Sequence, residues 1–344
     1  MGLIRRVLRH YLKQKHLRLH QAEIDTAIEQ LFYEINPRLR FFSNYQKTLS
    51  RPVWNALRHI HHVIDGIAGP VDAATRQWNL SPVLRAIFTN SSDMGKLFNR
   101  DTSLRKHIAA AQPEKADDFH VMIASTMQVR KVLGIAMRGN IMQREVPQTQ
   151  ISFADHRIVA SADSESGLRE KLKAFALEFV AHKVLANIGA ARSECEGLEQ
   201  ELALLRARMR MKLRQDSGKA CLCDQVEYSE GEMAAICSQI REKETLLNQT
   251  AIHQPTLQHF MDQLLLVLNS VERLLQIHEV SLHLDNMNIL LETPDADSVK
   301  PVELTEVLRE GHPARIMLIA RVPRDEVLAH DDMATRIDEA LKRL

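Results

Sequence analysis

The most constraining feature of this chain of 344 residues is an apolar stripe between Ile188 and Met209. Its members recur in alternating steps of three and four residues: Ile188, Ala191, Cys195, Leu198, Leu202, Leu205 and Met209. This spacing is that of a coiled-coil seam, in which one face of a helix is covered by a second helix. The stripe therefore predicts a long helix that needs a companion helix.

The chain offers a companion shortly downstream. A second apolar stripe at helical spacing consists of Met233, Ile236, Ile240 and Leu247. The stretch 215–229 between the two stripes is polar and contains Gly218. We therefore expect an antiparallel, coiled-coil-like helical hairpin with its tip near residue 220.

The fold class follows from the scarcity of helix breakers and from the place of the β signals. Only 12 Gly and 11 Pro occur in the chain, which suits helix interiors. We predict a mostly α chain with small antiparallel β elements, of the α+β class. Four regions are expected: a helical N-terminal body over 1–112, a helix plus antiparallel strands over 113–162, the long helical hairpin over 163–279, and a small mixed α/β region over 280–344 whose sheet can be shared with 133–160.

Helix boundaries are expected at several local signals. Pro37 ends an apolar stripe that starts at Ile24. Ser50-Arg51-Pro52 and Ser81-Pro82 place a capping residue and a proline at two helix starts. Further helices are predicted over about 117–131, 255–279 and 331–344.

Strands are predicted around residues with turn chemistry. Arg138-Gly139-Asn140 and Ala154-Asp155-His156 separate β-competent runs, which predicts three or four antiparallel strands over 133–160. A strand through Val280 is expected to turn at Asp285-Asn286. The apolar run Arg315–Val322 suits a central strand.

The first twenty residues are basic and amphipathic, with six Lys or Arg and no carboxylate before Glu23. The candidate membrane- or partner-binding residues are Leu3, Ile4, Arg5, Arg6, Val7, Leu8, Arg9, Tyr11, Leu12 and Lys13. Three interpretations stay open. The stripe can pack on the protein's own core, lie on an anionic membrane surface, or bind nucleic acid or an acidic protein.

Four other groups of residues invite a chemical interpretation. Cys221 and Cys223 have C-x-C rather than C-x₂₋₄-C spacing. His59 and His62 share a helix face near Asp65. His156, between Asp155 and Arg157, could pair with a serine, for which the candidates are Ser152, Ser161 and Ser164. The basic run Arg206–Arg214 could bind phosphate.

We favour a structural role for each of these groups, so no catalytic, cofactor or metal residue is assigned and no cofactor is expected. The chain has no P-loop, no G-x-G-x-x-G after a strand and no G-x-S-x-G elbow. These gaps count against an NTPase, a Rossmann dehydrogenase and an α/β-hydrolase. No run of about 18 apolar residues occurs, so no transmembrane helix is expected.

The function expected from these features is that of a non-enzymatic interaction or scaffold protein acting through the hairpin. Four Cys in this length favour the reducing cytoplasm, with peripheral membrane contact through the N-terminal helix. A protein partner or self-association is expected, and the small-molecule ligand is left undefined. The alternatives are an enzyme with a cleft between helical body and sheet, using Asp155, His156 and Arg157, and a nucleic-acid binder using Arg5–Arg18 or Arg206–Arg214. The net charge of +1 disfavours nucleic acid as a partner.

Overall fold

The computed structural model describes residues 20–110, 117–138, 141–219, 230–250, 256–291 and 301–328. They form an α+β protein with one mainly antiparallel sheet. The chain divides into two compact units, each built from two separate stretches. Unit 1 takes the described residues of Met1–Trp54 and Leu177–Asn269, and unit 2 takes those of Asn55–Ala176 and Ser270–Leu344. The expected N-terminal helix, the hairpin tip near residue 220 and the helix over 331–344 lie outside the described residues.

Unit 1 is helical. Its elements are α2 (Gln21–Ile35), η1 (Pro37–Phe41), the start of α3 (Tyr45–Asp65), most of α7 (Glu165–Lys219), α8 (Glu230–Thr250) and α9 (Leu257–Asn269). The apolar stripe that starts at Ile24 is buried, and α2 ends before Pro37 as predicted. Asn36 is extended, and its side chain accepts a hydrogen bond from the Arg38 amide. An extended residue before proline is the expected helix stop.

The predicted helix start at Ser50-Arg51-Pro52 is wrong. Helix α3 begins at Tyr45 and contains Pro52 in its interior. The Ser50 hydroxyl donates to the Gln46 carbonyl one turn back, instead of capping a new helix. Leu49 and Val53, on either side of this point, are fully buried. Their packing offsets the backbone hydrogen bond that proline removes.

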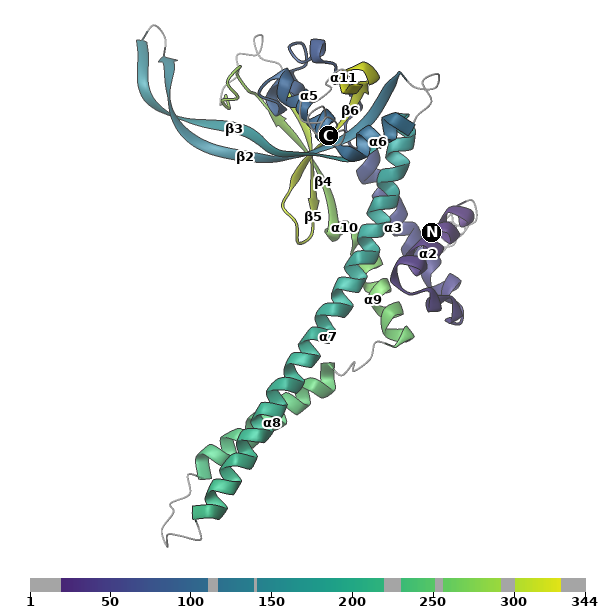
Figure 1. Cartoon of the computed structure of the whole chain (residues 1–344), viewed down its shortest axis with the longest axis vertical. Helices are drawn as coiled ribbons and strands as arrows, with labels where there is room; N and C mark the ends of the chain where they lie inside the picture. The colour runs from purple at the N-terminus through teal and green to yellow at the C-terminus, as the bar shows by residue number, and fades with distance from the viewer. Residues whose placement is uncertain are drawn as a thin grey trace, which may run out of the picture. The chain divides into compact units, whose positions relative to one another are not determined.

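Unit 2 is built on a six-stranded sheet. The strands are β1 (Val71–Asp72), β2 (Asp118–Arg138), β3 (Ile141–Ala162), β4 (Leu275–Leu282), β5 (Val302–Arg309) and β6 (Arg315–Pro323). Their order is β3-β2-β6-β5-β4 (Figure 1). Strand β1 pairs in parallel with β6. Strands from the two β regions of the sequence thus lie in one sheet. Strand β6 is central, as its apolar run predicts, and the consecutive residues Leu318 and Ile319 are buried on opposite faces.

The helix predicted over about 117–131 is wrong, because these residues belong to β2. Strand β2 lies between β3 and β6, so Val121, Met122 and Ile123 are all buried. A strand buried on both faces loses the period of two that marks a half-exposed strand. The helix predicted over 255–279 is also too long. Helix α9 ends at Asn269, α10 (Val271–Leu274) follows, and β4 starts at Leu275.

The predicted turn at Ala154-Asp155-His156 is also wrong, and the region 133–160 holds two long strands instead of three or four. Strand β3 runs through these residues, with Asp155 at a φ of 53°. The register with β2 shifts between Ala124 and Thr126, which marks a β-bulge. Asp tolerates the left-handed conformation, so the same residue suits a turn or a bulge. Beyond Ser125, the last residue paired with β6, β2 and β3 continue as a long ribbon (Figure 1). Ile289 forms a bridge with Gln150 of β3 in this part.

Short helices cover one face of this sheet. They are α4 (Pro82–Ile87), α5 (Ser91–Arg100), α6 (Thr102–Ala110) and α11 (Arg324–Leu328), with η2 (Thr75–Gln77) beside them. The predicted start at Ser81-Pro82 is confirmed, since the Ser81 hydroxyl accepts a hydrogen bond from the Leu84 amide. Phe88, Phe98 and Leu104 pack with Phe119 and Ile316 of the sheet in one buried cluster. This core positions α5 over the bulged part of β3.

Candidate functional site

The predicted seam residues of α7 are buried on one side of a single long helix. Ile188, Cys195 and Leu202 are buried, and Ala191, Leu198, Leu205 and Met209 are half-buried. Every other residue from 189 to 208 is exposed except Ala207, which is half-buried. A helix with such a narrow stripe needs a neighbour along that stripe.

The same spacing continues toward the N-terminus of α7. Leu177, Ala181 and Val184 are buried and precede Ile188 in steps of four, three and four residues. The sequence analysis missed this extension, although its signal was present in the spacing of the apolar residues. The buried stripe therefore starts at least eleven residues before Ile188.

Helix α8 lies beside the C-terminal half of α7 (Figure 1). Of its predicted stripe, Ile236 is buried, and Met233, Ile240 and Leu247 are half-buried. Two ion pairs join the helices. Arg206 Nη2 is 2.7 Å from Glu244 Oε1, and Lys243 Nζ is 2.6 Å from Glu201 Oε2. The hydrogen bond to Glu201, and then its charge, raise the pKa of Lys243.

The basic run Arg206–Arg214 is partly engaged by these contacts. Arg206 pairs with Glu244, while Arg208 and Arg210 are exposed. The side chains from Met211 to the end of the run lie outside the described part of the structure. Arg206 is therefore a helix-helix contact as well as a surface charge.

By length and composition, Glu165–Arg210 of α7 is the one described helix that could cross a membrane. A third of its apolar window is buried, and the core helix of a globular protein passes the same test. From Ile188 to Met209 the helix is apolar on one stripe and exposed elsewhere. A helix surrounded by lipid is instead apolar all round.

The histidine cluster on α3 has a structural contact. His59 Nε2 lies 2.7 Å from the carbonyl oxygen of Leu275, which ties α3 to the start of β4. No three His, Cys, Asp or Glu side chains among the described residues are placed to hold a metal ion. Cys221 and Cys223 lie outside the described residues, and Cys195 is buried in the seam of α7.

One of the candidate serines does meet a histidine, but it is His107 of α6. His107 Nδ1 is 2.9 Å from Ser161 Oγ, and its Nε2 is 2.9 Å from Asp163 Oδ1. A carboxylate only accepts, so neutral His107 donates from Nε2 and accepts from the Ser161 hydroxyl. The Asp163 side chain is 62% exposed, and neither pocket described below includes these residues. We infer that these contacts have a structural role and connect α6 to the end of β3.

A second serine–histidine pair involves His156, whose partner the sequence analysis did not identify. The Ser125 side chain is 1% exposed, and its Oγ is 2.8 Å from His156 Nδ1. The imidazole also packs against Phe88, with ring centroids 4.8 Å apart. Burial lowers the pKa of His156, opposed in part by the charges of Asp155 and Asp93. Ser125 could not be found from spacing, because only the bulge brings it opposite His156.

His156 and Arg157 line a pocket of about 560 Å³ between β3 and α5. Its lining residues are Asp93, Lys96, Leu97, Arg100, Asp101, His156, Arg157 and Ile158. Asp155 is not among them, and its carboxylate lies 3.9 Å from Arg315 Nη1. Two of the three residues in the predicted Asp-His-Arg group therefore meet in one cavity.

The carboxylates of this pocket already have local partners. Asp93 accepts from Lys96 Nζ at 3.0 Å and from Asn90 Nδ2 at 2.9 Å, and the Lys96 bond holds the pKa of Asp93 below its ordinary value. Asp101 accepts the Leu104 amide at 2.7 Å and so caps α6. Within the described part of the chain, Arg100 and Arg157 make no such contact.

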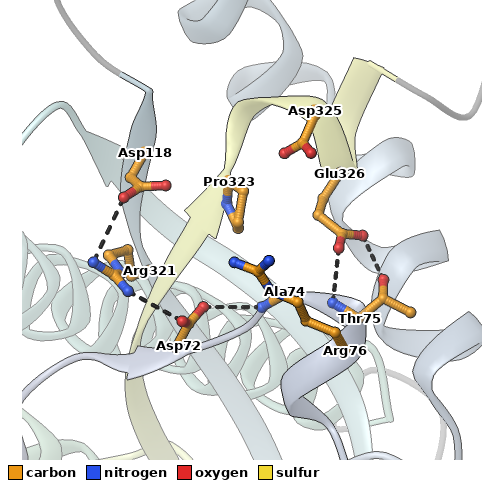
Figure 2. A pocket seen from close by; sticks show the side chains of 9 residues that line it. All are labelled: Asp72, Ala74, Thr75, Arg76, Asp118, Arg321, Pro323, Asp325 and Glu326. Carbon is orange, nitrogen blue, oxygen red and sulfur yellow. Dashed lines mark hydrogen bonds and ion pairs between the residues drawn. The ribbon is translucent and has the colours of Figure 1, made fainter.

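A second pocket, of about 510 Å³, lies at the C-terminal end of β6 (Figure 2). Arg321 lies 3.0 Å from Asp72 and 3.6 Å from Asp118, and Glu326 accepts from the amide and hydroxyl of Thr75. Most of its charges thus pair within the pocket. Figure 2 shows Arg76 reaching into the centre without a partner among the residues drawn. The lining comes from several separate segments, so no sequence motif marks it.

Comparison with known proteins adds no family assignment. No protein-family model matches this chain, and neither does any curated protein or solved structure. A functional proposal therefore depends on the geometry described above.

Proposed function

We propose that this chain is a non-enzymatic interaction protein, in which α7 and α8 form a coiled-coil hairpin that binds a protein partner or a second copy of the chain. The observation that carries the proposal is the seam of α7. Its residues from Ile188 to Met209 are buried or half-buried in steps of three and four, and α8 carries a matching stripe. Coiled-coil packing requires this spacing on both helices.

Two ion pairs between the helices support the proposed contact of α7 with α8. Glu201 and Arg206 on α7 contact Lys243 and Glu244 on α8. Both pairs flank Leu202, as charges flank an apolar seam in coiled coils. Exposed ion pairs of this kind contribute only about 0–1 kcal/mol each, so the apolar seam supplies most of the stabilisation.

The outward side of α7 is a surface suited to a further protein. Leu204 is 72% exposed and lies among exposed residues of α7, two positions from buried Leu202. An exposed leucine in a charged helical surface is a suitable anchor for a second helix. In the proposed hairpin α8 would cover the seam, and the partner would therefore bind this outer side.

The proposal is tested by photo-crosslinking in living cells. A benzophenone side chain replaces Leu204 in the full chain, and the matched control replaces Leu80, which is 74% exposed in unit 2. We expect a discrete crosslinked species from position 204 and none from position 80. Sedimentation velocity then distinguishes a second copy from another protein. No crosslink at position 204, in a chain that sediments as a monomer, would rule the proposal out.

The cellular setting is part of the same proposal. Four Cys in the chain suit the reducing cytoplasm. The basic N-terminal stretch would add peripheral contact with an anionic membrane surface. Engagement of Arg206 by Glu244 leaves fewer free charges for the alternative of nucleic-acid binding.

A further inference from the structure

We propose that the pocket between α5 and the bulged part of β3 binds a phosphate group. Arg100 and Arg157 are the anion ligands, and His156 supplies a hydrogen bond. This site lies in unit 2 and is independent of the hairpin proposed above. Two features support this assignment: the balance of charges in the pocket and the hydrogen bond that holds His156.

The charges of the pocket leave two guanidinium groups available. The basic lining residues are Lys96, Arg100 and Arg157, and the acidic ones are Asp93 and Asp101. Asp93 pairs with Lys96, and Asp101 caps α6. Arg100 and Arg157 have no partner among the described residues. A guanidinium presents its N–H groups as a fork that matches the oxygens of a phosphate.

His156 is held in one orientation by groups behind the pocket. The bulge places it opposite Ser125, and the Ser125 hydroxyl bonds its Nδ1 at 2.8 Å. Phe88 packs against the ring from the core. Ser125 is only 1% exposed, and a buried hydroxyl is unfavourable unless it is hydrogen-bonded. Burial of Ser125 therefore favours its hydrogen bond with His156. Bulges are enriched beside functional sites, where they re-aim a side chain.

The remaining nitrogen of His156 is available to a ligand. Nε2 has no partner among the described residues, whereas Nδ1 is engaged by Ser125. When Ser125 donates to Nδ1, the proton of the neutral ring resides on Nε2, which then donates. A phosphate monoester has three terminal oxygens, and inorganic phosphate has four, for the two guanidiniums and the imidazole, whereas a carboxylate has two. The number of donors therefore favours phosphate, either free or as a monoester.

The test is titration calorimetry of the full chain with three probes: inorganic phosphate, phenyl phosphate and acetate. We expect a phosphate probe to bind. The double substitution Arg100→Gln with Arg157→Gln should weaken this binding by at least about tenfold, because it removes the charge-assisted hydrogen bonds of both guanidiniums. The matched control is Arg76→Gln, which replaces an arginine of the other pocket and should leave the affinity unchanged (Figure 2). Preference for phenyl phosphate assigns a monoester, and preference for inorganic phosphate assigns the free ion.

Ser125→Ala tests the positioning role of Ser125 by a separate measurement. We expect a change in the ¹⁵N chemical shifts of the His156 ring, which report its tautomer, together with weaker phosphate binding. The site would be overturned if neither phosphate probe binds, if Arg76→Gln weakens binding as much as the double variant, or if acetate binds as tightly as phosphate. The basic N-terminal stretch is intact in every variant, so binding that survives the double substitution would also reject the pocket.

Discussion

At the scale of single residues, the clearest departure from an ordinary strand is the pair Ser125 and His156. A buried hydroxyl and a half-buried imidazole are hydrogen-bonded across a bulge, in a sheet whose other buried residues are mostly apolar. Burial disfavours the charged imidazole and therefore lowers its pKa, while Asp155 and Asp93 oppose this effect. The free energy of unfolding should therefore depend on pH through His156, and this dependence can be measured.

We expect the free energy of unfolding to fall as the pH decreases below about 6.5, the ordinary pKa of histidine. In that range the unfolded chain binds a proton at His156 and the folded chain does not, so acid favours unfolding. The stabilisation is fully present above this pH and is lost toward the lowered pKa of the folded state. Urea denaturation of the wild type and His156→Asn at several pH values checks this. The difference between them should shrink in acid, and a constant difference would contradict it.

At the scale of elements, α7 shows how spacing becomes packing. Leu202 and Leu204 are two residues apart on one helix, yet they are 3% and 72% exposed. Leu202 lies on the seam and Leu204 on the outer side. Their difference separates the contribution of seam packing from that of helix propensity.

We expect Leu202→Ala to destabilise unit 1 by about 2–5 kcal/mol, because it removes a buried side chain and leaves a cavity. Leu204→Ala should change stability by less than about 0.5 kcal/mol, since it alters an exposed position. Leucine and alanine are both good helix formers, so propensity cancels in the comparison. Chemical denaturation and hydrogen exchange of α7 amides measure both effects. Equal effects of the two substitutions would mean that α8 does not cover the seam.

At the scale of the whole molecule, the net charge is close to zero, but basic residues are concentrated in particular regions. The net charge of +1 provides no long-range attraction to anions, but six Lys or Arg fall in the first twenty residues. A second basic group lies on the β2–β3 ribbon at Arg130, Lys131 and Arg144, which are exposed. These groups allow a matched comparison of two regions in one chain.

We expect the full chain to float with phosphatidylserine vesicles, and replacement of Arg5, Arg6 and Arg9 by Gln to reduce that binding. Each basic residue near an anionic surface contributes about 1 kcal/mol, and raised salt should weaken the binding. Replacement of Arg130, Lys131 and Arg144 by Gln is the control and should have little effect. Equal losses from both triple substitutions would show that general charge, and not the N-terminal stretch, drives binding.

Local spacing determined a large part of this fold. The long helix α7, the end of α2 before Pro37, the helix start at Ser81 and the central strand β6 each depend on neighbouring residues. The turn at Asp285 is of this kind too, since its side chain accepts the amides of Met287 and Ile289. Such features are predictable because their energetics are decided within a few residues.

Only the tertiary structure decided the remainder. Strand β2 was mistaken for a helix because its neighbours β3 and β6, distant in sequence, bury both of its faces. Asp155 suits a turn and a bulge equally, and pairing with β2 selected the bulge. The same pairing joined His156 to Ser125, and the packing of α5 brought Arg100 into the pocket with Arg157. Spacing along the chain encodes periodicity, whereas convergence of distant side chains depends on long-range packing that periodicity does not specify.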